Sequence, residues 1–245
     1  MFLELQSNNI FKTVYFDLLK YQLTRGSLQI EGINAEAITV DQSMKVYNQL
    51  CAINYMFNNN IDYSYMSFLN LLCNVANLVS GGEVCNFRTT RAEVYGSNVE
   101  RSKPSMIRND LLYLLDNYKY MLTEAKNSKD LFEVEAFFHI RFLHIHPFED
   151  GNGRTSRILL TYNLSMHNLA PCIITLDNKK EYCTYIENND SKGLAKLFEE
   201  LSLQELDTMV AIYSDLDKRG LIESNKMTNE QKERYKKLIR YKNNS

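Results

Sequence analysis

Proline and glycine are scarce in this chain, and long apolar runs are missing. Three prolines and nine glycines among 245 residues leave little material for the turns of an all-β protein, so the composition favours helices. No apolar stretch is long enough to cross a bilayer, and the N-terminus has no basic region followed by an apolar one. We therefore expect neither a membrane segment nor a secretion signal.

An excess of basic charge and an even set of cysteines are also missing. The 28 Lys and Arg against 30 Asp and Glu give a net charge of −2, which does not indicate a nucleic-acid partner. The five cysteines are an odd number without metal-type spacing, which favours free thiols in a reducing compartment. The sequence therefore predicts a cytoplasmic protein.

The residues that are present indicate a soluble, mainly α-helical protein of about one domain. Hydrophobic residues make up 44% and charged residues 24% of the chain. Apolar residues recur at helical spacing in many segments, namely 9–24, 38–57, 64–78, 106–122, 131–145, 154–166, 193–203 and 205–213, and a basic helix is expected at 227–241. Gly26 is expected to end the first helix. We predict one domain over 1–202 and a C-terminal helical extension over 203–245.

One short stretch, from His146 to Arg157, gathers the groups of a phosphate site. Its two glycines let the backbone approach an anion, and a helix that begins at Arg154 would offer N–H groups and a positive dipole end to a phosphate. Arg154 and Arg157 are three residues apart, so both can project from the first turn. Asp150 suits a Mg²⁺ that accompanies a nucleotide, and His146 suits proton transfer near neutral pH.

The same stretch resembles the signature of Fic domains, His-Pro-Phe-x-Asp/Glu-Gly-Asn-Gly-Arg-x-x-Arg, and matches every defined position. Such a long motif, with apolar helical segments on both sides, is specific. The resemblance covers about Ser27 to Ser202. It implies the Fic fold, a helical bundle with a small β-hairpin, called the flap, beside the active-site loop.

The resemblance implies a protein adenylyltransferase, which moves AMP from ATP to a Ser, Thr or Tyr hydroxyl of a target protein. In that role His146 is the general base, and Asp150 holds Mg²⁺ between the α- and β-phosphates. Arg154 holds the γ-phosphate, and Arg157 neutralises charge on the β-phosphate. The groups that cradle the phosphates are Gly151, Asn152 and Gly153.

The segment Ser27-Leu28-Gln29-Ile30-Glu31-Gly32 resembles the inhibitory motif of Fic proteins, Ser/Thr-x-x-x-Glu-Gly/Asn. From the residues alone, Ser27 and Glu31 share one face of a short helix, which Gly32 ends. That pattern also fits a surface turn capped by a serine. The resemblance implies that Glu31 pairs with Arg154 and withholds it from the γ-phosphate of ATP.

The stretch from Phe87 to Lys103 is β-leaning and turns at Gly96-Ser97-Asn98, so it predicts a small hairpin. It could be mere edge decoration. In Fic domains this position holds the flap, which fixes a target segment by main-chain pairing. The flap residues are then Arg91, Ala92, Glu93, Val94 and Tyr95.

Three further residues are interpreted less specifically. Fic proteins commonly carry a tyrosine beside the adenine or ribose, and Tyr182 matches that place, although a core tyrosine fits the sequence nearly as well. His139 and His144 are interpreted as helix-packing residues, because their spacing with the loop matches no zinc site.

Of three alternatives to AMP transfer, the sequence argues against two and leaves one open. A phosphorylating relative of the fold carries a lysine in place of the second glycine, and the intact Gly153 argues against that activity. Removal of AMP, with Glu31 positioning water, stays open as a second activity. A catalytically quiet binding module would need no base, so the intact His146 argues against it. The target stays open, and so does a homodimer, since self-inhibited Fic proteins often associate.

Overall fold

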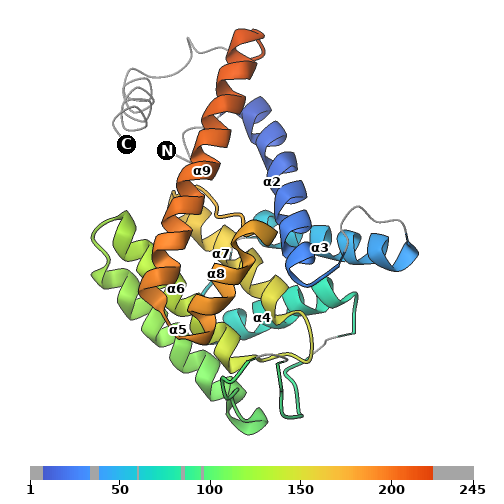
Figure 1. Ribbon diagram of the computed structural model, residues 1–245, viewed down its shortest axis with the longest axis vertical. Coiled ribbons are helices and arrows are strands. Elements are labelled where there is room, and N and C mark those ends of the chain that lie inside the picture. Colours follow the sequence, from blue (N-terminus) through green and yellow to red (C-terminus); the bar gives the residue numbers. More distant parts are fainter. Residues whose placement is uncertain (1–7, 34–38, 60, 84–85, 95–96, 223–245) are drawn as a thin grey trace.

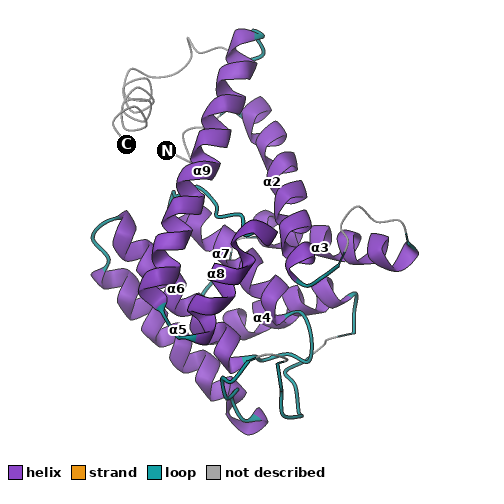
Figure 2. Cartoon of the chain, viewed as in Figure 1, coloured by secondary structure: helices purple, strands orange, loops and turns teal. Residues whose placement is uncertain are grey.

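The computed structural model describes residues 8–33, 39–59, 61–83, 86–94 and 97–222. All regular structure in these residues is helical (Figure 2). The elements are α2 (Asn9–Ile30), α3 (Val40–Asn58), α4 (Tyr65–Ser80), the short 3₁₀ helix η1 (Pro104–Met106), α5 (Ile107–Glu124), α6 (Ser128–Ile145), α7 (Asn152–Met166), α8 (Leu176–Glu187) and α9 (Ser191–Lys218). Among them, none is both long and apolar enough to cross a membrane.

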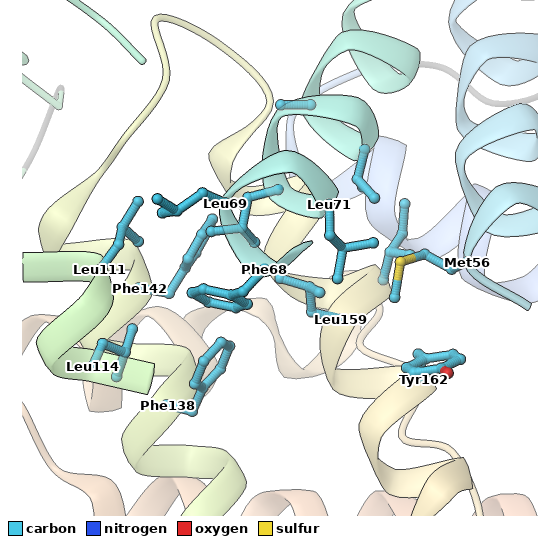
Figure 3. Packing of buried hydrophobic residues seen from close by; sticks show 14 of the residues in the cluster. Met56, Phe68, Leu69, Leu71, Leu111, Leu114, Phe138, Phe142, Leu159 and Tyr162 are labelled. Atoms are coloured by element: carbon cyan, nitrogen blue, oxygen red, sulfur yellow. The ribbon is translucent and has the colours of Figure 1, made fainter. Parts of the chain in front are cut away.

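Helix α7 lies at the centre of the fold, and α3, α4 and α6 pack around it (Figure 1). Almost every residue of α7 is buried, including its polar ones. Figure 3 shows the apolar side chains that surround it, with Phe68 of α4 between Phe138 of α6 and Leu159 of α7. A helix that is buried on all sides is held in place on every face. The position of the signature loop, which leads into α7, is therefore fixed by the core.

The prediction that Gly26 ends the first helix is wrong, because α2 continues through it to Ile30. A Cβ atom at residue 26 would lie 2.5 Å from the carbonyl oxygen of Ile174. Glycine at this position therefore allows α2 to approach the backbone that follows α7. The close approach brings the end of α2, with Ser27 and Glu31, to the start of α7.

The outer half of α2 is held by α9, which runs beside it (Figure 1). Phe11, Tyr15 and Met209 belong to the buried cluster between the two helices, and the Tyr15 hydroxyl donates to Glu205 at 2.9 Å. Helix α9 is continuous across residues 202 and 203, so the division placed there stays a prediction. The basic segment 227–241 lies outside the described residues.

The predicted hairpin is wrong for the described part of the chain, since residues 86–94 and 97–103 contain no strand (Figure 2). The two arms enclose a hollow of about 400 Å³ instead of pairing with each other. Side chains fix each arm to the core: Arg88 donates to carbonyls around His146, and Ser97 donates to Glu187 at 2.7 Å. These side-chain bonds replace the main-chain ladder that the β-leaning sequence suggested. We call residues 88–94 and 97–102 the flap segment below.

Glu205 makes stability dependent on pH. Burial raises the pKa of its carboxyl to about 7, because desolvation disfavours the charged form. A carboxyl with a raised folded-state pKa loses its contribution to stability as the pH rises through 7. Glu205→Gln should therefore stabilise the protein at pH 8 by on the order of 2 kcal/mol, with no gain below pH 4.5.

Equilibrium unfolding in denaturant at pH 8 and pH 4.5 would measure the difference in unfolding free energy between Glu205→Gln and the wild type. Glu200→Gln, at an exposed position of the same helix, is the matched control. A gain of the same size at both pH values would show that the buried charge is not its cause.

Candidate active site

His146 follows the last residue of α6 and adopts a left-handed backbone conformation, with φ 51° and ψ 62°. Its N–H donates to the carbonyl of Phe142 at 3.0 Å, which ends the helix. A non-glycine residue in this region costs roughly 1–2 kcal/mol, so the surroundings must hold it there. The turn directs the chain from α6 into the signature loop.

Arg88, which lies in the flap segment, stabilises that turn through its side chain. It is 2% exposed, and its guanidinium donates to the carbonyl of His146 at 2.6 Å and that of Ile145 at 3.2 Å. Arg101 donates to the carbonyl of Leu143 at 3.4 Å. Cations near the last carbonyls of a helix satisfy their free lone pairs and oppose the negative dipole end. The sequence reasoning assigned no role to either arginine.

The His146 imidazole is neutral at physiological pH. Burial and, to a lesser extent, the positive charges of Arg101 and Arg88 together lower its pKa to about 4, against smaller opposite effects from Leu143 and Asp150. The ring donates a hydrogen bond to the Leu143 carbonyl, which leaves its other nitrogen with a free lone pair. The residue predicted as the base is therefore present in its proton-accepting form.

Phe148 and Asn152 fix the shape of the signature loop. Phe148 is buried against Phe87, at a ring-centroid distance of 5.6 Å. The Asn152 amide accepts from the N–H of Phe148 at 3.0 Å and donates to its carbonyl at 2.8 Å. This differs from the predicted contact of the Asn152 side chain with phosphate, because both ends of the amide are engaged by the loop backbone. Asn152 therefore contributes to the site by shaping the loop.

Helix α7 begins after Gly151, whose φ of 81° lies in the left-handed region where glycine is favoured. The N–H of Thr155 is the first to bond back into the turn, to the Gly151 carbonyl at 2.8 Å. The N–H groups of residues 152–154 precede it in the first turn, where a helix has no internal partners for them. These donors and the dipole suit a phosphate.

Arg154 is engaged by three groups and is 4% exposed. It donates to the Val79 carbonyl at 2.7 Å and to Asp150 at 2.7 Å. Its Nε lies 2.9 Å from Oε2 of Glu31. The pair that the resemblance implied between Glu31 and Arg154 is thus formed in the structure, and Asp150, the predicted metal ligand, shares the same guanidinium.

Arg157 is also held by the end of α2. It donates to the Ser27 hydroxyl at 2.8 Å, to the Ser27 carbonyl at 3.0 Å and to Oε1 of Glu31 at 2.8 Å. Burial lowers its pKa, but the adjacent Glu31 and Tyr182 outweigh that effect and raise it. Gly153 leaves the room for this contact, since a Cβ there would lie 2.9 Å from Arg157 and 3.1 Å from Glu31.

Glu31 therefore bridges the two arginines with one carboxylate. It is the C-terminal cap of α2, followed by Gly32 with a φ of 76°. A negative charge at a helix C-terminus is opposed by the dipole, so this placement depends on the two guanidinium groups. Its side chain is 26% exposed, which leaves part of the carboxylate open to solvent.

Tyr182 lies in the core rather than on an open surface. It is 2% exposed, and its hydroxyl lies 2.6 Å from Nε2 of His139. The structure therefore favours the core-tyrosine alternative, and contact with a nucleotide base stays a prediction without support from this geometry. His139 packs inside the helix bundle as predicted, and burial lowers its pKa to about 3.

Asp150 has the exposure that a metal ligand needs, with 65% of its side chain accessible. One carboxylate oxygen accepts from the Gly151 N–H at 2.6 Å and the other from Arg154. Among the described residues, no group of three metal-ligating side chains is found. A single carboxylate fits Mg²⁺, which is commonly bound by one or two carboxylates together with substrate phosphates.

The flap residues lie beside the signature loop. Arg91 and Glu93 are exposed, and Ala92 and Val94 are half-buried, whereas Tyr95 lies outside the described residues. Next to them, the Thr90 hydroxyl donates to Glu149 at 2.9 Å. Glu149 occupies the variable position of the signature, to which no role was assigned. It joins the flap segment to the loop.

Comparison with known proteins agrees with this geometry. Residues 67–164, which include α6, the loop and most of α7, match the model of the Fic/DOC family. Over these residues the chain is similar to Fic/DOC family proteins. It is 30% identical over 142 residues to the protein adenylyltransferase Fic of Drosophila grimshawi, and 30% over 146 residues to that of Aedes aegypti. Each match covers 56% of this chain but only 28% and 27% of those relatives.

Solved structures show the same Fic fold. A Fic domain containing signaling protein from Bacteroides thetaiotaomicron superposes with a TM-score of 0.68 at 15% identity, over 85% of this chain and 94% of that protein. Fic-1 from C. elegans gives 0.62 at 18% identity, over 88% and 72%. BepC from Bartonella tribocorum, solved with bound AMPPNP, gives 0.52 at 16%, over 65% and 82%. At these identities the likeness concerns the fold alone.

The hydroxyl of Tyr182 should contribute measurably to the stability of this protein. Tyr182→Phe leaves a buried ring nitrogen of His139 without its partner, which costs about 1–3 kcal/mol. Equilibrium unfolding in urea would measure the loss. Tyr185→Phe is the matched control, because its hydroxyl bond to Glu181 is exposed to solvent. Equal losses in the two variants would contradict a buried role for the Tyr182 hydroxyl.

Proposed function

We propose that this protein transfers AMP from ATP to a Ser, Thr or Tyr hydroxyl of a target protein, and that Glu31 inhibits the transfer. The observation that carries the proposal is the position of the unprotonated His146 imidazole, which a short loop separates from the start of α7. The two arginines of the site, Arg154 and Arg157, lie on that helix. The relatives named protein adenylyltransferase Fic and the AMPPNP bound to BepC support it.

His146 acts on the attacking group. As the target hydroxyl oxygen forms a bond to the α-phosphorus, the bond from that phosphorus to the bridging oxygen of pyrophosphate breaks. The hydroxyl proton passes to the ring nitrogen of His146 that is not engaged by Leu143. Pyrophosphate leaves with the electron pair of the broken bond. The residues around the site chiefly position the reactants and offset charge.

The start of α7 binds the phosphates. The N–H groups of residues 152–154 and the helix dipole face the anion, and Arg154 holds the γ-phosphate while Arg157 neutralises charge on the β-phosphate. Asp150 is the residue that would hold Mg²⁺. The metal, when bound with the nucleotide, offsets negative charge on the departing pyrophosphate.

Inhibition follows from competition for the same donors. Glu31 forms an ion pair with Arg154, at 2.9 Å from its Nε, and accepts a hydrogen bond from one amino group of Arg157. A γ-phosphate that binds Arg154 must displace the carboxylate of Glu31, because one guanidinium edge cannot serve two anions. Release of α2, or loss of the Glu31 carboxylate, would free both arginines for ATP.

An experiment with radiolabelled ATP tests AMP transfer, catalysis by His146 and inhibition by Glu31 separately. ATP labelled at the α-phosphate is incubated with Mg²⁺ and the wild type, Glu31→Gly, or Glu31→Gly/His146→Ala, alone and in a lysate. We expect labelled protein with Glu31→Gly, at least tenfold less with the wild type, and none with the double variant, since loss of a general base costs about 10²–10⁴-fold. ATP labelled at the γ-phosphate should give no label.

Glu83→Gly, at an exposed loop position, is the matched control and should behave as the wild type. Absence of label with all variants would contradict the transferase proposal. Equal labelling by the wild type and Glu31→Gly would contradict inhibition by Glu31 and leave the transferase in place.

The pH dependence of the transfer should reflect the lowered pKa of His146. Because the free enzyme protonates this ring only near pH 4, the base form persists well below pH 6.5. In Glu31→Gly, kcat/KM for ATP, corrected for protonation of MgATP, should show its acid limb near pH 4. An acid limb near pH 6.5 would mean that the imidazole is not held neutral by its surroundings.

Removal of AMP from a modified target is a second candidate. The observation that favours it is the open part of the Glu31 carboxylate, 26% exposed beside the signature loop, where it can orient a water molecule. Target that was labelled by Glu31→Gly serves as the substrate. Release of labelled AMP by the wild type, but not by Glu31→Gln, would establish this activity.

A further inference from the structure

In the described part of the chain, every hydrogen bond that the Arg88 side chain donates is accepted by a backbone carbonyl. Its Nε donates to His146 at 2.6 Å, and Nη1 donates to Thr90 at 2.7 Å. Its Nη2 donates to Ser102 at 2.5 Å and to Ile145 at 3.2 Å. One planar group thereby binds four carbonyls from three separate stretches of the sequence.

These four carbonyls belong to two different parts of the site. Those of Ile145 and His146 form the end of α6 and its left-handed turn, whereas those of Thr90 and Ser102 lie on the two arms of the flap segment. The backbone N–H of Arg88 also donates to Pro147 at 2.9 Å. Arg88 therefore binds the chain on both sides of the base and joins it to both arms of the flap segment.

We propose that Arg88 is a positioning residue for AMP transfer: it fixes the left-handed turn of His146 and the flap segment as one unit. A target held on the flap segment then presents its hydroxyl to the imidazole in a single geometry. This inference rests on the proposed function, and it assigns to Arg88 no contact with ATP or target.

The arrangement requires a guanidinium group. Four carbonyls in different directions need the rigid, planar set of five N–H donors that arginine has. A lysine ammonium has three donors at one point and cannot reach both arms and the turn. Arg88 is 2% exposed, so a replacement that misses a carbonyl leaves it buried without a partner.

A second arginine reinforces the unit without replacing it. Arg101 donates to the Ser97 hydroxyl at 2.6 Å and to the Leu143 carbonyl one turn before His146. Its charge also lowers the pKa of His146, as the charge of Arg88 does. Only Arg88, however, contacts the turn of His146 itself.

The test compares Arg88→Lys and Arg88→Gln in the Glu31→Gly background with Arg141→Lys, an exposed arginine on the same helix as the turn. Lysine keeps the charge and loses the geometry. Glutamine removes the charge, is smaller, and provides a second variant if the lysine form does not fold. Transfer of α-labelled AMP is measured per folded molecule, alongside NMR titration of the histidine ring resonances. The protein has four histidines, and His146→Ala assigns the signal of the base.

We expect kcat to fall by roughly 10- to 100-fold in both Arg88 variants, since a displacement of about 1 Å at a reacting group can have that effect. KM for ATP should stay within about twofold, because the groups of α7 are unchanged. The pKa of His146 should rise from about 4 in Arg88→Gln and stay unchanged in Arg141→Lys.

A kcat within twofold of the parent in the Arg88 variants would overturn the inference. So would a loss of kcat that accompanies an equal rise in KM for ATP, because that pattern indicates general damage. If the parent itself transfers no AMP, the proposed function has failed. The NMR signal of His146 then still tests whether Arg88 fixes the turn, and an unchanged signal in both variants would refute that.

Discussion

One carboxylate bridges two buried guanidinium groups at the start of α7. Glu31 contacts Arg154 and Arg157 at 2.9 and 2.8 Å, and both arginines belong to the first two turns of a helix that the core surrounds. Because α7 cannot shift within that core, the contact places α2 against the phosphate-binding turn. Gly26 allows α2 to approach the backbone at Ile174, and Gly153 leaves room for the side chains of Glu31 and Arg157. Helix α2, which ends at this contact, is held at its outer half by α9.

The chemistry of the site could be predicted from the sequence because it is local. The charged and polar groups of the signature lie within twelve residues, and their spacing at the start of a helix determines which of them face an anion. The segment Ser27 to Gly32 could be connected to them through the family resemblance. Its bond between Ser27 and Arg157 follows from the same helical face but needed the structure to be found.

The features that escaped prediction depend on contacts between distant segments. Nothing in the local pattern distinguishes Arg88, which is buried against the turn of His146, from the exposed Arg91. The hairpin expected around them fails because side-chain bonds to α6 and α8 replace main-chain pairing. Asn152 resembles a phosphate ligand in sequence, whereas its amide closes the loop on Phe148. Tyr182 could be a base platform or a core residue until its partner His139 was located.

The most direct test of the account is a crystal structure of Glu31→Gly with Mg²⁺ and a non-hydrolysable ATP analogue. The account predicts the γ-phosphate on Arg154, the metal on Asp150, and the α-phosphate facing the free ring nitrogen of His146. A nucleotide bound elsewhere, with Arg154 still held only by Val79 and Asp150, would contradict the claim that Glu31 and the γ-phosphate compete for one guanidinium.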